Sequence, residues 1–407
     1  MKRTGFALIA ILSIVSMLIA CGDDKNEEAP KVTEQTVLMY IPWADDSLMY
    51  NACKKNITAM KTAIEYQRGL NGKRLLTLVA ETEDSALLVE IKYERGICVD
   101  DTIKRYQSLT PASFTTSDGV TAFFKDVVAA APAKHYGLTI GCHGMGWLPV
   151  ETAKSNAKQQ TAPNVPPYRP NSYFTGERIP TRYFGSHPNQ MLYQTEISVL
   201  KTAVSNSFGH LDFLLFDDCY MQNIETAYLL RDITDHIIAS TCEMMMVGIP
   251  YATVGSALLR GDYAAVVNGF YDFFNSYHPG PYGTLSVVKT SELESTAQLM
   301  KTINSQHQWD SKDNGLIQAF DDYSRNVFFD MGSYVKRLCQ DDQTLAKQME
   351  EQLNRLVPYK AHTEYFYATE YKRAIKMEEF SGISISDPST SSKAETKETT
   401  EWWKATH

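Results

Sequence analysis

Short, continuous apolar runs alternate along this chain with longer segments whose apolar positions repeat like one face of a helix. Runs of this kind are typical of strands buried on both faces of a sheet. The predicted strands are 36–41, 74–80, 86–92, 136–142, 211–216, 236–240, 284–288 and 382–386. The predicted helices are 48–68, 117–131, 196–205, 221–235, 264–277, 292–307 and 345–356. This alternation predicts an α/β fold with a mostly parallel central sheet.

Two of the predicted strands end beside side chains that can act together in catalysis. The strand over 136–142 leads into His143, and the strand over 211–216 leads into Asp217, Asp218 and Cys219. The carboxyl ends of parallel strands border the crevice in which open α/β sheets bind ligands. A thiolate is a strong nucleophile, and a neighbouring imidazole can accept and return its proton. The pattern therefore predicts a cysteine nucleophile served by a histidine.

The neighbours of this pair fit the same chemistry. The helix predicted over 221–235 starts directly after Cys219, and N–H groups at a helix N-terminus favour a thiolate and can stabilise an oxyanion. Gly144 leaves the backbone beside His143 bare, so we expect a substrate carbonyl to approach closely there. We expect Trp147 to form a nearby wall of the site.

Two simpler interpretations stay open on spacing alone. A single histidine after a strand is commonly structural, and a single buried cysteine is commonly inert packing. A metal site formed by Cys142, His143, Cys219 and Cys242 is disfavoured, because adjacent strand residues point to opposite faces of a sheet. We therefore expect no metal site.

The first residues have the features of a targeting segment. Lys2 and Arg3 precede an apolar run over 6–20 that is too short to span a bilayer comfortably, and Cys21 follows Ala20. This order resembles the bacterial lipoprotein signal, in which the cysteine carries the lipid; an ordinary secretory signal with an incidental cysteine is the alternative. We predict a signal peptide over 1–20, lipidation of Cys21, an acidic flexible tether over 21–35, and a location in the bacterial cell envelope outside the cytoplasm.

The composition and length of the chain limit the kinds of partner and the number of domains to be expected. The chain is 43% apolar and carries a formal charge of −9, which argues against nucleic acid as a partner. We predict one large domain over 36–407. Its segment 148–190 contains seven prolines and little periodicity. A long irregular insert of this kind is usually functional or disordered.

Four segments resemble the clostripain family of cysteine peptidases, which belongs to the caspase-like group of folds. They are TVLMYIPWADDSL at 36–48, LTIGCHGMGW at 138–147, FLLFDDCYMQNIETAYLLRDITDHIIAS at 213–240 and GIPYATV at 248–254. The second resembles the family's His-Gly-x-Gly-Trp block, and the third resembles its Asp-x-Cys-Leu-Met block. The resemblance implies a three-layer α/β/α sandwich and a cysteine endopeptidase that acts on peptides or proteins.

The resemblance also implies roles for individual residues. Cys219 matches the nucleophile and His143 the general base and acid, with backbone N–H groups of Gly144 and Cys219 as oxyanion donors. Asp217 matches an acidic position at the primary specificity pocket. The residues expected around the bound peptide are Asp217, Glu243, Met244 and Trp147. Calcium dependence is known in the family, so calcium is a possible cofactor, although no calcium-loop spacing is present.

Two departures from the family pattern bear on activity and specificity. Asp218 stands where family members commonly have alanine, and a carboxylate pointing at the thiol would raise its pKa. Members that cleave after Arg or Lys use acidic pocket residues, whereas the segment 241–250 offers only Glu243 among several methionines. The methionines either line an adaptable apolar pocket or pack in the interior.

The leading hypothesis is a membrane-tethered, monomeric cysteine endopeptidase. The resemblance implies that such peptidases stay inactive until a loop between the two catalytic blocks is cut, so we expect self-cleavage in the insert over 148–190; the alternative is a loop without this role. Basic residues available for self-cleavage there are Lys154, Lys158, Arg169, Arg178 and Arg182. The alternative is a catalytically weak surface lipoprotein that binds peptides or partners on the same fold. Asp218 and the methionine-rich segment are its only support.

Overall fold

The computed structural model describes residues 30–42, 47–150, 172–174, 194–278 and 280–407. The predicted signal peptide, Cys21 and most of the tether lie outside the described residues, as do most of the 148–190 insert and its five basic residues. Within the described part of the chain, no helix has both the length and the apolar character needed to cross a bilayer.

A nine-stranded sheet forms the centre of the molecule, in the order β11-β9-β8-β7-β5-β1-β2-β3-β4. Its strands are β1 (Thr33–Ile41), β2 (Arg74–Thr82), β3 (Ser85–Glu94), β4 (Ile97–Tyr106), β5 (Ala133–Ile140), β7 (Phe213–Phe216), β8 (His236–Ala239), β9 (Thr284–Lys289) and β11 (Tyr359–His362). The five central strands, from β8 to β2, are parallel. The strands at both ends are antiparallel. The predicted α/β class with a mostly parallel sheet is confirmed.

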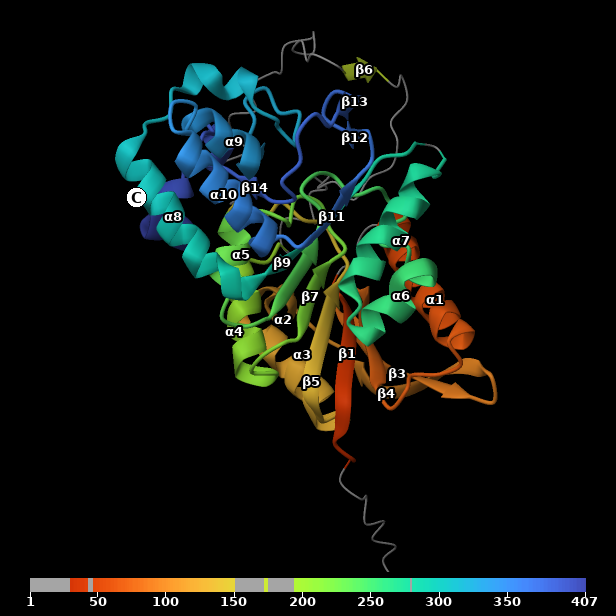
Figure 1. Cartoon of the computed structure of the whole chain (residues 1–407). Coiled ribbons are helices and arrows are strands. Elements are labelled where there is room, and N and C mark those ends of the chain that lie inside the picture. Colours follow the sequence, from red (N-terminus) through yellow and green to blue (C-terminus); the bar gives the residue numbers. More distant parts are fainter. Residues whose placement is uncertain (1–29, 43–46, 151–171, 175–193, 279) are drawn as a thin grey trace, which may run out of the picture.

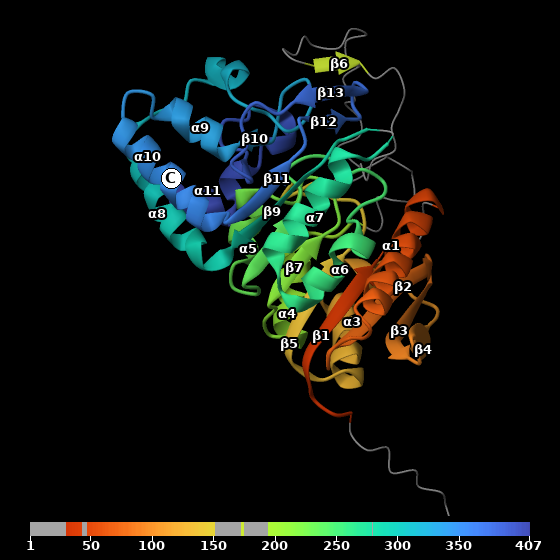
Figure 2. The same cartoon turned by 45° about the vertical axis from the view of Figure 1, so that its right-hand side comes forward.

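Alternate residues of the central strands face two separate hydrophobic cores, which explains why these strands are apolar throughout. In β1, Leu38 and Tyr40 belong to one core, and Val37 and Met39 belong to the other. Helices α1 (Ser47–Tyr66), α6 (Tyr251–Arg260) and α7 (Tyr263–Asn275) cover the second core. Those over the first core include α2 (Pro111–Thr115), α3 (Ser117–Ala130), α4 (Ile197–Ser207), α5 (Ile224–Leu230) and α8 (Leu293–Gln306). Figures 1 and 2 show the resulting three layers.

Two small sheets accompany the central sheet. One has the order β12-β13-β6, formed by β12 (Tyr365–Ala368), β13 (Arg373–Lys376) and β6 (Ser172–Phe174). This sheet lies beyond the carboxyl ends of the central strands, at the top of Figure 1. The other pairs β10 (Phe329–Asp330) with β14 (Ser384–Ile385). Strand β6 belongs to the predicted insert, so a part of that insert is antiparallel to β13.

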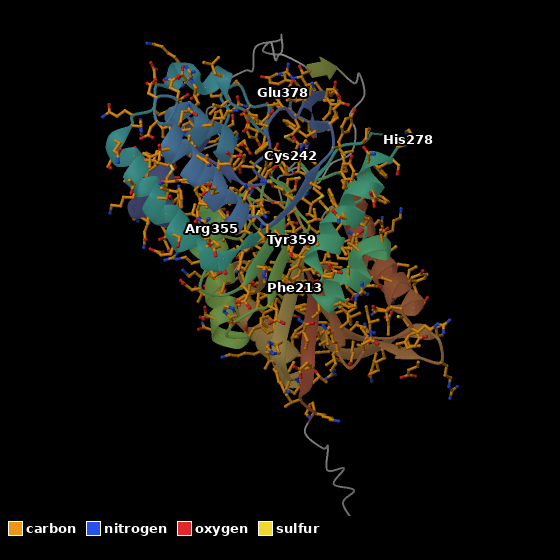
Figure 3. All side chains as sticks on the ribbon, in the orientation of Figure 1. Phe213, Cys242, His278, Arg355, Tyr359 and Glu378 are labelled. Carbon is orange, nitrogen blue, oxygen red and sulfur yellow. The ribbon has the colours of Figure 1, made fainter. Side chains whose placement is uncertain are left out.

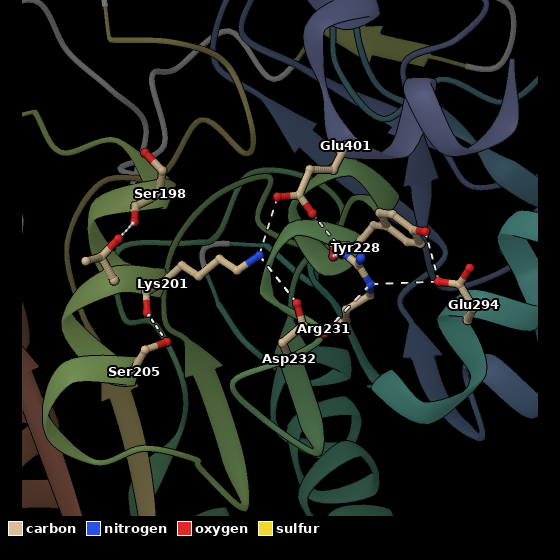
Figure 4. A network of polar contacts seen from close by, with 9 residues as sticks. Ser198, Lys201, Ser205, Tyr228, Arg231, Asp232, Glu294 and Glu401 are labelled. Carbon is tan, nitrogen blue, oxygen red and sulfur yellow. Dashed lines mark hydrogen bonds and ion pairs between the residues drawn. The ribbon is translucent and has the colours of Figure 1, made fainter.

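The end of the chain packs against the helix that follows β7. Helices α9 (Met331–Leu338) and α10 (Gln343–Leu356) precede the last helix, α11 (Glu401–Thr406). Trp402 of α11 is fully buried and makes an edge contact with Tyr228 of α5, with ring centroids 5.6 Å apart. Around it, Glu401 accepts ion pairs from Lys201 at 3.4 Å and Arg231 at 2.8 Å (Figure 4). Because these pairs are partly exposed, we attribute most of the anchoring to Trp402.

The structure contains several elements that were not predicted, among them α2, α9, α11, β11, β12 and β13. Strand β4 was also not predicted, because it is an exposed edge strand in which Asp100, Asp101, Lys104 and Arg105 interrupt the apolar pattern. Helix α6 was not predicted either. The helix predicted over 221–235 is correct in kind but spans only Ile224–Leu230.

Candidate active site

Strands β5 and β7 are direct neighbours, and this pairing brings the two predicted chemical groups to one edge of the sheet. The strands are parallel, with Ile140 registered opposite Phe216. The ladder continues one step, because the Asp217 N–H donates to the Ile140 carbonyl at 2.8 Å. His143 and Cys219 therefore follow the same registered pair at equal distance along their chains. In Figure 3, the labelled Cys242 lies above Phe213, the first residue of β7, toward this carboxyl edge.

The two loops that follow β5 and β7 are in direct contact. A Cβ atom on Gly144 would lie 2.5 Å from the Cys219 carbonyl oxygen and 2.8 Å from Asp218 Cβ. Real Cβ atoms do not approach other atoms so closely, so only glycine fits this position without movement. The bare backbone at Gly144 therefore admits the Cys219 loop, whereas the sequence argument had assigned this space to the substrate.

Asp218 holds the same two loops together from the other side. Its Oδ1 accepts the Cys142 N–H at 2.6 Å, and the Cys142 thiol lies 3.6 Å from its Oδ2. The carboxylate that replaces the family's alanine is therefore engaged by the backbone next to His143. It still contributes to raising the pKa of the nearby Cys219 thiol, as described next.

The Cys219 thiol is fully buried. Its Sγ accepts the Met244 N–H at 3.2 Å. Burial raises the pKa of Cys219 well above its ordinary value, and the Glu243 and Asp218 carboxylates raise it further, while the Met244 N–H opposes this shift. In this conformation the surroundings of Cys219 therefore favour the protonated thiol over the thiolate. Both ring nitrogens of His143 are also shielded from solvent.

The chain after Cys219 does not enter a helix directly. Tyr220 adopts a left-handed conformation with φ of 58°. The next residues run beside 240–242, with the Tyr220 N–H donating to the Cys242 carbonyl and the Gln222 N–H to the Ser240 carbonyl. Helix α5 then starts after Asn223, whose side chain caps it. The prediction that a helix N-terminus lies at the thiol is therefore wrong. The backbone group that donates to the Cys219 sulfur is the Met244 N–H instead.

Asp217 lies in a small, mostly apolar pocket at the carboxyl ends of β1, β5 and β7. Its Oδ1 accepts the Ile249 N–H at 2.8 Å, and its Oδ2 accepts the Asn56 side-chain amide at 2.7 Å. The pocket has a volume of about 10 Å³, enough for roughly one water molecule. The lining residues are Met39, Ile41, Cys53, Asn56, Thr139, Gly141, Asp217 and Tyr251.

Asn56 was not identified from the sequence. It lies in α1, 161 positions before Asp217, and nothing in the local pattern of that helix distinguishes it from its polar neighbours.

Glu243 and Met244 both lie in the interior. The Glu243 carboxylate accepts the Tyr220 hydroxyl at 3.0 Å, the Thr369 N–H at 2.9 Å and the Thr369 hydroxyl. Met244 and Met245 are buried in the core on the α6 and α7 side. Of the two interpretations of the methionines, packing in the interior therefore describes these two residues.

Trp147 is half-buried on the other side of the His143 loop. Its indole N–H donates to the Ser386 hydroxyl at 2.9 Å. Gly146 precedes it with φ of +62°, and a Cβ there would lie 2.5 Å from the Asn223 amide nitrogen. Among the described residues, no group of three or more His, Cys, Asp or Glu side chains is arranged to hold a metal ion.

Comparisons with known proteins agree with this architecture. The model of the clostripain family matches residues 172–397, a range that includes Cys219 and begins after His143. A comparison with curated protein sequences gives no match.

Solved structures of C11 cysteine proteases are similar to the chain. One is a secreted protease from Bacteroides thetaiotaomicron, iotapain, with 42% identity and a TM-score of 0.81 over 93% of this chain and 100% of that one. Another is a clostripain from the same species bound to the peptide inhibitor BTN-VLTK-AOMK, with 47% identity and a TM-score of 0.52 over 55% of this chain and 99% of that one.

A third similar structure is an inactive zymogen C11 protease from Parabacteroides distasonis, with 25% identity and a TM-score of 0.72 over 93% of this chain and 99% of that one. Both the family model and the 42%-identical structure cover most of the chain, and the central sheet with its two helical layers is that of these proteases. The chain therefore belongs to the clostripain family and is a cysteine-type endopeptidase with a caspase-like α/β/α fold.

Proposed function

We propose that this endopeptidase uses Cys219 as its nucleophile and His143 as its general base and acid. The observation that carries the proposal is the contact between the two strand-end loops, in which Gly144 packs on the Cys219 carbonyl and Asp218 binds the Cys142 N–H. A cysteine peptidase needs a thiol and an imidazole held by rigid elements. Adjacent parallel strands supply that support.

The reaction follows from these positions. His143 removes the thiol proton, and the Cys219 sulfur attacks the peptide carbonyl carbon. The backbone N–H groups of Gly144 and Cys219 are the proposed donors to the oxyanion. Protonated His143 then gives its proton to the departing amine, which leaves a thioester. Water, deprotonated by His143, hydrolyses the thioester and frees the thiol.

The thiol must first become accessible. Because Cys219 is fully buried against Met244, a peptide carbonyl reaches the sulfur only after the 242–250 segment moves. The same movement would separate the thiol from Glu243, whose charge opposes ionisation. We infer that the described conformation is a resting form.

Replacing either reacting residue tests the dyad. We expect Cys219→Ala to abolish peptide hydrolysis and His143→Ala to lower kcat/KM by at least about a hundredfold, because proton transfer is lost. Iodoacetamide labelling of Cys219, followed by peptide mass spectrometry, should be slower in His143→Ala than in the parent. Cys98→Ala, on the distant strand β4, is the matched control and should hydrolyse peptides like the parent. Equally slow labelling of the parent and His143→Ala would contradict the proposal.

We propose that the pocket at Asp217 receives the side chain preceding the cleaved bond once the site opens. Its carboxylate is already oriented by Asn56 and by the Ile249 N–H. Glu243, Met244 and Trp147 are the other residues that the family resemblance implies around the bound peptide. The relative crystallised with the peptide inhibitor BTN-VLTK-AOMK supports a peptide as the ligand.

A peptide library tests this assignment. For Asp217→Asn, the ratio of cleavage after Lys or Arg to cleavage after apolar residues should fall by about tenfold or more, because a charge-assisted hydrogen bond is lost. Because both cleavage rates are measured on the same enzyme sample, their ratio does not depend on how much of a variant is folded. Asp330→Asn changes a buried acid outside this pocket and should leave the ratio at the parent value. If the ratio in Asp217→Asn equals that of the parent, Asp217 does not select the side chain that precedes the cleaved bond.

We propose that the enzyme is activated by self-cleavage within the 148–190 insert. Support comes from the buried thiol and from a relative described as an inactive zymogen. Pairing of β6 with β13 would keep part of a cut insert attached to the domain.

Incubating the purified chain tests self-cleavage. The parent should convert from one band to two on a denaturing gel, with the new N-terminus inside 148–190, while Cys219→Ala stays intact. Persistence of a single band in an active parent sample would refute self-cleavage.

We propose that a lipid on Cys21 tethers the domain at the cell envelope. The 42%-identical relative is described as secreted, which supports export of this chain. Strand β1 starts at Thr33, at the end of the molecule opposite the candidate site (Figure 1). A tether on that side would leave the site facing away from the membrane.

Fractionation of producing cells tests the anchor. The parent should partition with membranes and Cys21→Ser should not, because a thioether-linked lipid cannot form on serine. Membrane association of Cys21→Ser equal to that of the parent would contradict lipidation.

A further inference from the structure

A chain of hydrogen bonds connects the His143 loop to helix α5 through the end of the chain. The Trp147 indole N–H donates to the Ser386 hydroxyl at 2.9 Å. The Ser386 backbone N–H donates to Glu225 Oε1 at 2.7 Å. Glu225 lies in the first turn of α5, and Ser386 directly follows β14. The Glu225 carboxyl group therefore fixes the segment to which this wall of the site is attached.

A second buried acid lies next to Glu225. Glu225 is 2% exposed, and Asp387, which follows Ser386, is 8% exposed. Within the described part of the chain, Glu225 Oε2 has no hydrogen-bond partner, and the donor near the second Asp387 oxygen is the Trp402 indole N–H, which lowers the pKa of Asp387. Two ionised carboxylates in one buried site repel each other and lack solvation. The Asp387 charge acts on Glu225, so keeping one proton on the pair removes one of the two buried charges.

The groups facing this pair provide only partial compensation. The Lys397 ammonium donates to the backbone carbonyls of Asp387 at 2.5 Å and Ser389 at 2.7 Å. Tyr334 of α9 and Trp402 of α11 also face Asp387. One ammonium balances one carboxylate, which leaves the second acid without a counter-charge.

We propose that Glu225 and Asp387 hold one proton between them near neutral pH, and that this protonated pair positions Trp147, and with it the His143 loop, through Ser386. Glu225 is thus a positioning residue. The second half of the proposal rests on the function proposed for His143, and the first half does not.

The electrostatics agree with this geometry. Burial, and then the Asp387 charge, raise the pKa of Glu225 to about 8, and burial raises the pKa of Asp387 to about 7. The folded protein thus retains a proton that the unfolded chain loses above its ordinary value of 4.5. This contribution to stability is complete below that value and is lost as the pH rises through about 8. Ionisation of both acids would make Asp387 and Glu225 repel each other, which would displace the neighbouring Ser386 and with it Trp147.

The proton kept on Glu225 and Asp387 is tested by measuring thermal stability. The parent and the variants all carry Cys219→Ala in this experiment, so that the enzyme cannot cut its own chain. Glu225→Gln keeps an acceptor for the Ser386 N–H and offers an N–H to Asp387. Between pH 6 and pH 8.5, the parent Tm should fall by about 2–4 °C more than the Tm of Glu225→Gln. Glu294→Gln is the matched control, because Glu294 is exposed and also contacts α5, through Tyr228. It should follow the parent.

The positioning role is tested by the pH profile of kcat/KM in otherwise native enzyme. The parent and Glu294→Gln should lose kcat/KM between pH 7 and pH 9, and Glu225→Gln should lose less. Equal pH dependence of Tm in the parent and Glu225→Gln would overturn the shared proton. A changed Tm profile with an unchanged kcat/KM profile would overturn the positioning role. Hydrolysis that survives Cys219→Ala would refute the dyad while leaving the Tm result intact.

Discussion

The parallel pairing of β5 with β7 is the constraint on which the candidate site depends. Its register places His143 and Cys219 the same number of residues beyond a matched pair, at one edge of a sheet buried on both faces. The two loops then close on each other, which requires a glycine at 144 and uses Asp218 as the acceptor for the Cys142 N–H. Backbone geometry, more than any single side-chain contact, thus determines where the thiol and imidazole lie.

Several ionisable groups are buried near the carboxyl edge of the central sheet, where a charge without partners is unfavourable. The thiol lies in a site without solvent and near Glu243 and Asp218, both of which oppose its ionisation. Asp217 avoids the same problem through two hydrogen-bond donors, Asn56 and the Ile249 N–H. Burying an acceptor together with its donors costs little free energy, whereas ionising a buried thiol close to two carboxylates costs more. This difference explains why the described conformation suits a resting enzyme.

The sequence predicted the elements whose environment is uniform along their length. Strands such as β1 and β7 are apolar on both faces, so their composition alone identifies them. Strand β4 escaped prediction because it is an exposed edge strand with charged residues. The helix after Cys219 was placed too early because the left-handed Tyr220 and the pairing of 220–222 with 240–242 delay its start. Contacts between segments distant in sequence decide such boundaries.

The sequence by itself determined the fold class, the family resemblance and the two candidate reacting residues, because apolar runs and compact motifs are local features. Only the tertiary structure decided what surrounds them. It engages Asp218 with the backbone at Cys142, buries Met244 against the thiol, and brings Asn56 to Asp217 across 161 positions. It also connects Glu225, Ser386 and Trp147. Hydrogen bonds between distant segments leave no periodicity in the sequence, so only the folded chain reveals them.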